Sequence, residues 1–590
     1  MMESVDDPRD PAHRGDHAVR RWGPAIGFIG IVIAFLVTRL PYLDADIPVW
    51  ELTQYSPIDE LGYTVPAFNL VHYGTWVHQA APWAPVEGLP MNVVENVAAA
   101  ITMRMIGYDY WGLRASSLAF GLVAFLCMVG IVRRQVVNAQ RLDRIPSWLA
   151  LAVTGGAVLL LLADFSFILS ARIIEPTVTR LAVAAVVVYL VSRGTFLGER
   201  HGLKRSGAFG VVIGAAVIFV YIYNLFLVPA ALATVAWWAF RAGGWSAVAR
   251  HTTAFVVGVV AIWAVYFALV LGIYGQTPLE WYRVWIGSFA GSARASGISL
   301  DNALTVLDGN IFRLDPAFLG LFLASLPVFV WGLVRRPDPA GILIGAGLIF
   351  LVAQTAFVAD YPARKGLMML LFALPIAAAG IALLGPFREW LAMRRRRVIA
   401  AGVWLAVALA ITLLESPLRP VPAHGSVLAM IVAGAGVVGV VAIAIVAITR
   451  RNRIALAGMA VIGLAVLAPL LYVDAAFVYR HPTFTYRDAQ IAVRPDIDGQ
   501  QTAGGWSFGM QLYNTSRPVV NGYFYGMSRS DYERNLVRVF AEGRATSMFD
   551  YVDDPTRAPL ESLGFRVVDT YDILLPRGKV LGRYVFAPDE

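Results

Sequence analysis

Charged residues are scarce in this 590-residue chain: Asp, Glu, Lys and Arg together make up 15% of it. Soluble domains carry about 25% charged residues. Hydrophobic residues make up 58% of the sequence, and the mean hydropathy is +0.63. This balance nearly excludes a cytosolic enzyme or a disordered scaffold, and it predicts a chain that lives in a lipid bilayer.

Cysteine and lysine are also rare. Cys127 is the only cysteine and lies inside an apolar run, which excludes a disulfide framework and a thiolate cluster for a metal. Lysine occurs only at Lys204, Lys365 and Lys579, so nearly all basic residues are Arg. The net charge of +8 is too modest to argue for nucleic-acid binding. In a membrane protein, basic residues are better interpreted as markers of topology.

Long apolar runs recur along most of the chain. About 20 apolar residues cross the hydrocarbon core of a bilayer, and the sequence holds roughly thirteen such runs. The first, Pro24 to Leu40, follows several arginines and has no small-residue cleavage site behind it, so it is expected to be an anchor and not a removed signal peptide. We therefore expect a polytopic α-helical membrane protein with about 13 transmembrane helices.

Basic residues cluster in every second connection between these runs, as the positive-inside rule requires. The clusters fall within 133–144, 193–205, 241–250, 335–336, 394–397 and 450–453. The count depends on splitting Ala208 to Phe240 near Asn224 into two spans and on accepting the short run Val178 to Val191. With an odd number of spans, the N-terminus is expected in the cytoplasm and the C-terminus outside. The preference for Arg over Lys is typical of GC-rich bacterial genomes, so we expect a multi-pass protein of a bacterial inner membrane.

The expected organisation is a cytoplasmic tail over 1–23, a transmembrane domain over 24–474 and an extracytoplasmic domain over 475–590. Two long external loops interrupt the transmembrane domain, at 41–110 and 274–315. The last segment alternates polar residues with short β-type runs, such as Pro518 to Tyr525 and Phe565 to Val568, and holds a helical stretch from Asp531 to Phe540. This pattern predicts a small α/β domain with its own core.

The first external loop carries two adjacent carboxylates, Asp59 and Glu60, in a turn shaped by Pro57 and Gly62. Such a pair at the membrane boundary can supply a general base, because burial and the neighbouring charge raise the pKa of one carboxyl. That chemistry suits the activation of a hydroxyl group. The simpler alternative is a solvated acidic turn.

The context of this pair resembles a known family. Tyr63 follows Glu60 by three residues; then come Gly74-Thr75-Trp76, Gly107-Tyr108 and the run from Gly112 to Ser117 with Leu-Arg before a span. This series is similar to the opening of the GT-C glycosyltransferases related to the protein O-mannosyltransferases and the lipid A aminoarabinose transferase. The resemblance covers roughly Arg39 to Phe120 closely, and the remainder by architecture only.

The resemblance implies an enzyme that moves a sugar from a polyprenyl-phosphate carrier to an acceptor hydroxyl of a glycan, lipid or protein on the outer face of the membrane, with inversion. It implies Asp59 as the catalytic base, Glu60 as its partner and Tyr63 among the substrate-binding residues. A lipid-linked donor keeps its phosphate at the membrane interface, so the acceptor must be deprotonated there. The polyprenyl phosphate leaves as an anion and needs no proton.

A second group of residues, Arg172 and Glu175, lies between the third and fourth predicted spans. Three residues apart, they would share a face on a helix. The related enzymes carry an Arg and an acid in this loop, commonly Asp, so Glu175 departs from their pattern and its role is in doubt. A structural ion pair that orients the loop is the competing interpretation.

A third group, Arg364 and Lys365, lies on a connection that should be poor in positive charge. These side chains are suited to bind the phosphate that links sugar to lipid, Arg through a bidentate fork and Lys as a point charge. The related enzymes have a comparable stretch before a span that ends in Leu-Pro, as Leu374-Pro375 does here. Snorkelling toward lipid headgroups is the competing account.

No metal or other cofactor is required by these residues. His72 and His78, with Glu87 and Glu95 beyond them, match no zinc spacing, although a divalent metal near Asp59 is compatible with the sequence. The alternative function is a polyprenyl-lipid or solute transporter or flippase, which would place its carboxylates near the bilayer midplane and break helices there. The acids of this chain lie mostly at span ends, with Asp164 as a partial exception.

Overall fold

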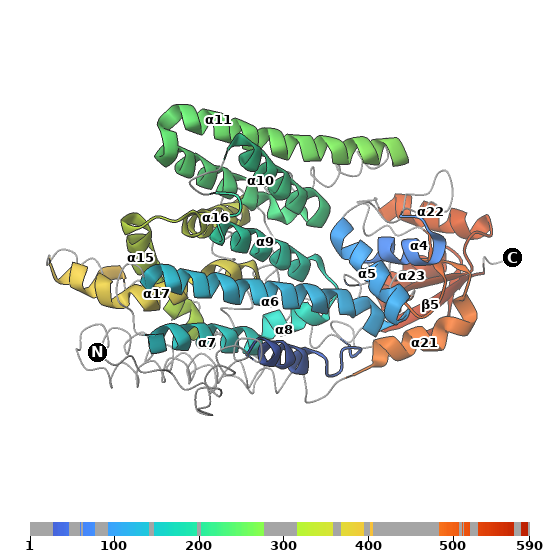
Figure 1. Ribbon diagram of the computed structural model, residues 1–590. Coiled ribbons are helices and arrows are strands. Elements are labelled where there is room, and N and C mark those ends of the chain that lie inside the picture. The colour runs from blue at the N-terminus through green and yellow to red at the C-terminus, as the bar shows by residue number, and fades with distance from the viewer. Residues whose placement is uncertain are drawn as a thin grey trace, which may run out of the picture.

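The computed structural model describes residues 27–46, 60, 63–76, 92–140, 147–197, 202–275, 316–357, 367–393, 402–404, 483–504, 506, 510, 512–519, 529–571 and 580–587. Figure 1 shows a bundle of long helices with a smaller unit of strands and helices at one end of it. The short helices of the first external loop lie between the two parts.

The bundle is built from apolar helices. A first helix, Gly27–Arg39, precedes α6 (Tyr110–Gln140), α7 (Ser147–Ala163), α8 (Phe165–Arg172), α9 (Pro176–Ser192), α10 (Leu203–Ala215), α11 (Leu227–Tyr274), α15 (Pro316–Arg335), α16 (Pro339–Phe357) and α17 (Met369–Ala392). Among the described residues, five helices are long and apolar enough to cross a membrane, or six if the bent pair α7 and α8 forms one span. The figure of about 13 spans stays a prediction, and the stretch 405–482, where the last of them would fall, lies outside the described residues.

Two helical segments are interrupted within the bundle. The axis bends by 55° between α7 and α8, where the Phe167 N–H donates to the Asp164 carboxylate and so starts a new helix. After α10, a π-turn η1 (Ala216–Val220), the extended Tyr221 and a 3₁₀ turn η2 (Ile222–Phe226) lead into α11. The helix is therefore broken at the place near Asn224 where the sequence predicts two spans. A further kink divides α11 at Gly243 and Gly244.

Helix α6 runs through the centre of the bundle, against α9, α8, α7 and α17 (Figure 1). Small residues allow the closest approach. A Cβ added to Gly121 of α6 would lie 2.6 Å from the Cβ of Ala171 in α8. Lipid tails are as apolar as the side chains, so the hydrophobic effect does not drive helices together within a bilayer. Close packing of small residues is therefore a main source of helix association there. This contact brings the C-terminal end of α8, next to the predicted second site group, against α6.

The C-terminal unit is a mixed five-stranded sheet of order β2-β1-β3-β5-β4. Its strands are β1 (Gln501–Ala503), β2 (Arg517–Pro518), β3 (Ser547–Tyr551), β4 (Phe565–Tyr571) and β5 (Leu581–Phe586), and its helices are α21 (Thr485–Ile497), α22 (Arg529–Ala541) and α23 (Asp554–Ser562). The pairs of β1 with β2 and β3 are parallel, and those of β5 with β3 and β4 antiparallel. The run predicted from Phe565 lies in β4 and the helix predicted from Asp531 in α22, whereas the run Pro518 to Tyr525 lies mostly outside the described residues.

This unit rests on the segment predicted as the first external loop, whose described helices are α4 (Val65–Tyr73) and α5 (Val93–Ile106). Side chains of α4, α5, α21 and the sheet share one hydrophobic cluster. At its edge, the Tyr73 hydroxyl donates to the Thr515 carbonyl at 2.8 Å and the Thr485 hydroxyl donates to Asp46 at 2.9 Å. Figure 1 shows α4 and α5 on the side of the C-terminal unit that faces the bundle. The described helices α4 and α5 of this segment thus lie between the bundle and the C-terminal unit.

Candidate functional site

Glu60 and Arg114 form a buried ion pair at the start of α6. The Arg114 guanidinium donates from Nε to Glu60 Oε1 and from Nη2 to Glu60 Oε2, each at 2.7 Å. The side chains are 4% and 0% exposed. A parallel pair of charge-assisted bonds fixes both position and orientation. The second acid of the predicted pair is therefore held rigidly, and it is not part of a solvated turn.

Arg114 also holds the beginning of the first external loop. Its Nη1 donates to the carbonyls of Leu43 at 2.7 Å and Ala45 at 2.6 Å, and its guanidinium lies 4.2 Å from the centre of the Tyr110 ring. In the sequence, Arg114 contributes to the family resemblance, but its role as the partner of Glu60 was not predicted. The sequence signal that could have predicted this pair is an Arg just inside a predicted span and close to a loop that carries acids.

The ion pair also contacts a third segment, the connection between α8 and α9. The Ile174 N–H donates to Glu60 Oε1 at 3.1 Å. Both oxygens of Glu60 therefore accept hydrogen bonds, from α6 and from this connection. We call this arrangement the Glu60 junction, formed by Glu60, Arg114, Ile174 and the carbonyls of Leu43 and Ala45. It joins three segments that are distant in the sequence.

Arg172 and Glu175 do not share a helical face, so that prediction is wrong. Arg172 is the last residue of α8, Ile173 is extended, and Glu175 is the N-cap residue of α9. Arg172 Nη2 donates to the Tyr42 carbonyl at 2.5 Å, and the Glu175 carboxylate accepts from the Thr177 hydroxyl at 2.8 Å. The helix ends because Pro176 follows: a residue before proline is disfavoured in the α conformation. In the chain, Arg172 and Glu175 nevertheless lie within two residues of Ile174, and Tyr42, which Arg172 holds, directly precedes Leu43 of the Glu60 junction.

Tyr63 lies against the interruption between α10 and α11. Its hydroxyl is 3.4 Å from the hydroxyl of Tyr221, and the two rings meet edge to face at 88°. Tyr221 is the extended residue at that interruption. Tyr63 therefore connects the segment just after the acidic pair to a helix interruption whose Tyr223 carbonyl accepts from Arg180 at 2.9 Å and from Gln354 at 3.2 Å.

A second buried acid, Glu95 on α5, was considered in the sequence only for a zinc spacing. It is 1% exposed, and its carboxylate lies near the Thr179 hydroxyl without a hydrogen bond of ordinary geometry. Burial, and next the nearby Glu175 carboxylate, raise the pKa of Glu95 well above its ordinary value, while the Thr179 hydroxyl opposes the rise. The sequence does contain a signal for this residue: Glu95 is an acid within the otherwise apolar run that begins at Val93. In the part of the chain described here, no group of three or more His, Cys, Asp or Glu side chains is arranged to hold a metal.

Asp59, Arg364 and Lys365 lie outside the described residues. The expectation that Asp59, Arg172 and Arg364 converge on one cavity therefore stays a prediction. Of the seven predicted site residues, the structure describes Glu60, Tyr63, Arg172 and Glu175. It brings Glu60 together with the connection that bears Arg172 and Glu175.

Comparison with solved structures identifies the fold. ArnT from Cupriavidus metallidurans bound to undecaprenyl phosphate matches with a TM-score of 0.54 and 15% identity, over 95% of this chain and 98% of that one. The apo form of the same protein gives 0.52 and 15%, over 96% and 98%. The archaeal oligosaccharyltransferase AglB from Archaeoglobus fulgidus, in complex with an inhibitory peptide and a dolichol-phosphate, gives 0.48 and 11%, over 92% and 71%. No protein-family model and no curated protein sequence matches the chain.

The similarity to ArnT extends over almost the full length of both chains, so this chain has the overall fold of ArnT. The resemblance drawn from the first external loop and from the architecture is thereby confirmed at the level of the fold. At 15% identity, residue roles are not transferred by this match.

Proposed function

We propose that this chain is a membrane glycosyltransferase that moves a sugar from a polyprenyl-phosphate carrier to an acceptor hydroxyl on the outer face of a bacterial inner membrane. Two lines of support meet. The fold is that of ArnT, a protein solved with undecaprenyl phosphate bound. The observation that carries the proposal is the Glu60 junction, because it fixes the residue next to Asp59 between the first external loop and the α8–α9 connection.

In this proposal Asp59 is the catalytic base and Glu60 is a positioning residue. Both oxygens of Glu60 already accept charge-assisted and backbone hydrogen bonds, so Glu60 acts on the position of the loop and not on the acceptor. The peptide bond joins Asp59 to Glu60, and consecutive Cα atoms lie about 3.8 Å apart. A rigid Glu60 therefore restricts where Asp59 can be, as a general base must be held within hydrogen-bond reach of its substrate.

The proposed reaction is a single inverting displacement at the anomeric carbon. Asp59 takes the proton of the acceptor hydroxyl, whose oxygen forms the new glycosidic bond while the bond from the anomeric carbon to the phosphate oxygen breaks. The electron pair leaves on the polyprenyl phosphate as an anion. Arg172, Arg364 and Lys365 are proposed to stabilise this developing charge, an effect that is large where water is excluded.

Tyr63 and Glu175 are proposed to shape the donor site. The Tyr63 ring presents an apolar face and a hydroxyl beside the interrupted helix, both of which suit a sugar linked to a lipid. Glu175 is 3% exposed and held by Thr177, so it is preorganised for contact with a hydroxyl group of the sugar or acceptor. The C-terminal unit closes the first loop from outside and is proposed to contact the acceptor.

The test is sugar transfer by purified chain in reconstituted membranes, with a polyprenyl-phosphate sugar as donor. Asp59→Asn should abolish transfer while expression, elution volume and melting temperature stay unchanged. Asp44→Asn is the matched control, because Asp44 lies in the same loop but forms a partly exposed ion pair with Arg487 at 2.7 Å. It should keep nearly full activity. Full activity of the Asp59→Asn protein would contradict the assignment.

A lipid transporter is the second candidate, favoured by one specific feature. The bend at Asp164 and the interruption around Tyr221 are broken helices of the kind that form transporter binding sites. A transporter would move a labelled polyprenyl lipid between leaflets without any acceptor. Lipid translocation that persists in the Asp59→Asn protein, together with no glycosyl transfer in the parent, would favour that function.

A further inference from the structure

The interruption between α10 and α11 is held by side chains from two other helices. Arg180 of α9 donates from Nε to Asn224 Oδ1 at 3.0 Å and from Nη2 to the Tyr223 carbonyl at 2.9 Å. Gln354 of α16 donates to the same carbonyl at 3.2 Å and accepts from the Phe226 N–H at 3.1 Å. We call Arg180, Asn224 and Gln354 the interruption network. It joins α9 and α16 to the backbone of a single turn.

These side chains lie where a broken helix needs partners. Arg180 and Asn224 are fully buried, and Asn224 Nδ2 also donates to the Ala216 carbonyl at 3.0 Å. Inside an apolar bundle, water does not serve the peptide groups that a break withdraws from the regular helix, so other protein groups must bond to them. The conformation of the 3₁₀ turn η2 therefore depends on contacts from outside its own segment.

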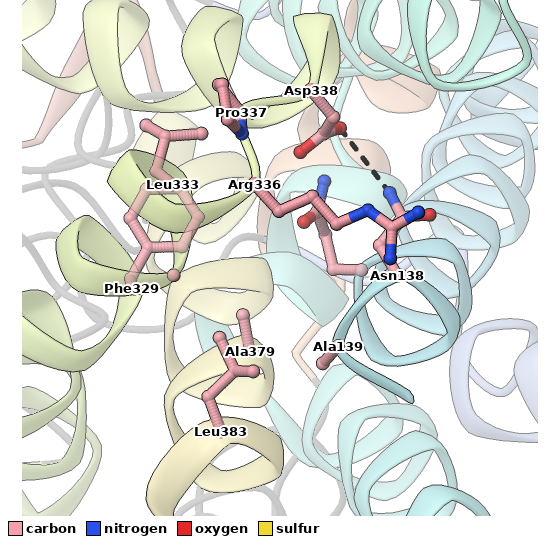
Figure 2. Close-up of a pocket in the computed structure, with 11 residues that line it drawn as sticks. Asn138, Ala139, Phe329, Leu333, Arg336, Pro337, Asp338, Ala379 and Leu383 are labelled. Atoms are coloured by element: carbon pink, nitrogen blue, oxygen red, sulfur yellow. Dashed lines mark hydrogen bonds between the residues drawn. The ribbon is translucent and has the colours of Figure 1, made fainter. Parts of the chain in front are cut away.

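Helix α16 is held at its other end by a separate contact. Asp338, directly before α16, accepts from the Gly341 N–H at 3.2 Å, and Asn138 Nδ2 of α6 lies 3.5 Å from the same oxygen (Figure 2). Asn138 and Asp338 also line a cavity of about 120 Å³. About 24 Å of helix separates Asp338 from Gln354, at 1.5 Å per residue. We therefore expect a substitution at Gln354 to affect the interruption and not the start of α16.

The interruption network leads directly to Tyr63. Tyr221 comes just before the 3₁₀ turn, and its ring centre lies 5.0 Å from that of Tyr223, whose carbonyl accepts from both Arg180 and Gln354. Tyr221 in turn meets Tyr63, with 3.4 Å between the two hydroxyls. The rings of Tyr221 and Tyr223 belong to one small buried cluster, and Tyr63 packs against it. The position of Tyr63 thus depends on the conformation of the interruption.

We infer that the interruption network positions the site of the lipid-linked donor: it holds Tyr221, and through it Tyr63, where Tyr63 contacts the sugar. This inference rests on the proposed function, in which Tyr63 shapes the donor site. Without the network, the turn would rotate to recover hydrogen bonds along its own helix, and Tyr221 would move away from Tyr63. The Glu60 junction is held by Arg114 of α6 instead, so the chemical step should stay intact.

The first test is donor kinetics of the full-length chain in reconstituted membranes, with a polyprenyl-phosphate sugar as donor. Gln354→Leu keeps a side chain of similar size but removes both contacts with the turn, so the KM for the donor should rise by about tenfold while kcat stays within about twofold of the parent. Asn224→Leu removes the contacts with Arg180 and Ala216 and should give the same separation of KM from kcat.

Thr355→Val is the matched control. Thr355 is fully buried next to Gln354, but its hydroxyl donates within α16, to the Val352 carbonyl at 2.8 Å. This variant should leave KM and kcat unchanged. A lower melting temperature with an unchanged KM in both Gln354→Leu and Asn224→Leu would show that the network only stabilises the bundle, and the inference would be overturned.

A cross-linking measurement separates this inference from the proposed function. Cys127 is the only cysteine, so Tyr63→Cys and Tyr221→Cys can be introduced together into a Cys127→Ser chain and joined by bifunctional thiol reagents of graded length. The shortest reagent that joins them should no longer do so when Gln354→Leu is added, and should still do so with Thr355→Val. An unchanged yield with Gln354→Leu overturns the inference, even in a chain that transfers sugar. If the yield is lost but the parent transfers no sugar, the network positions Tyr63 as inferred and the proposed function is what fails.

Discussion

The carboxylate of Glu60 lies in the fork of the Arg114 guanidinium, with two parallel contacts of 2.7 Å, although 54 residues separate them in the chain. Buried ion pairs contribute little net stability when intact, because desolvation offsets the attraction. Removing one partner is different, since the other charge is then buried alone. We therefore expect the main role of this ion pair to be positional: it holds Glu60, and with it the loop that carries Asp59, in one place.

The first prediction concerns this pair. Arg114→Ala should destabilise the protein by about 3–5 kcal/mol, because it leaves the Glu60 carboxylate uncompensated. The double substitution Glu60→Leu with Arg114→Met should recover much of the melting temperature but not the transfer activity. Thermal melts and transfer assays on both proteins test this. Recovery of activity together with stability would show that the pair has no positioning role.

The prediction of the acidic pair and of its surroundings came from local features of the sequence. Composition and loop polarity indicated an external loop with adjacent acids, and apolar runs indicated the spans. The partner of Glu60 was not predictable in this way, because Arg114 approaches it only when α6 and the first loop pack together. Sequence spacing carries no information about contacts of that range.

The prediction that Arg172 and Glu175 share a helical face was wrong for a local reason. A spacing of three residues indicates a shared face only if the helix is continuous, and Pro176 directly after Glu175 argues against that. The same proline at the first position of α9 is a helix-start signal. The interruption near Asn224, in contrast, was predictable because a single apolar run was too long for one span. What the sequence does not supply is the contact of Tyr63 with that interruption.

The second prediction concerns Glu95 and pH. Its folded-state pKa lies well above the ordinary value of 4.5, so the folded protein binds the proton more tightly than the unfolded chain does. Its contribution to stability is therefore fully present below about pH 4.5 and is lost as the pH rises toward the folded-state pKa. Glu95→Gln keeps the shape without the ionisation, and it should flatten the fall in melting temperature between pH 5 and pH 8.

A matched variant separates charge from packing at this position. Glu95→Ala leaves a cavity and should destabilise the protein by about 2 kcal/mol at pH 5. Because it also removes the ionisation, its deficit relative to the parent should shrink as the pH rises. Glu95→Gln should keep most of the transfer activity, because the neutral amide resembles the protonated acid. Loss of activity in the Gln variant, with a normal melting temperature at pH 5, would instead require an ionised Glu95 in the reaction.

The third prediction concerns the attachment of the C-terminal unit. Asp46 accepts from the Thr485 hydroxyl at 2.9 Å and lies 3.3 Å from the Tyr486 N–H in the first turn of α21. Asp46→Ala removes these acceptor contacts and should cost about 1 kcal/mol, in the range of a lost helix cap. Arg487→Gln breaks ion pairs with Asp44 and Asp488 that are partly exposed, and should cost less than about 1 kcal/mol. Limited proteolysis between the two parts should be faster for Asp46→Ala and nearly unchanged for Arg487→Gln; equal rates would contradict the role of Asp46.

The last prediction separates the two interpretations of Arg172. As a structural residue, it holds the Tyr42 carbonyl through Nη2, and Tyr42 is a non-glycine residue with a φ of 53°. As a phosphate-binding residue, it supplies positive charge beside the Glu60 junction. Arg172→Gln removes the charge and shortens the side chain, so its amide no longer reaches the Tyr42 carbonyl. The first interpretation therefore predicts a lower melting temperature with little change in kcat. The second predicts a lower kcat with little change in melting temperature.

We expect the second result: kcat lower by on the order of 100-fold, as for the loss of one group that stabilises transition-state charge, with a melting temperature within a few degrees of the parent. Arg172→Lys keeps the charge and should recover part of kcat, because a Lys acts as a point charge without the bidentate fork. Tyr42→Gly is the control for the structural role. Glycine adopts a positive φ without strain, so this variant relaxes the turn that Arg172 holds and leaves the charge in place. If its kcat falls as far as that of Arg172→Gln, the turn and not the charge accounts for the effect.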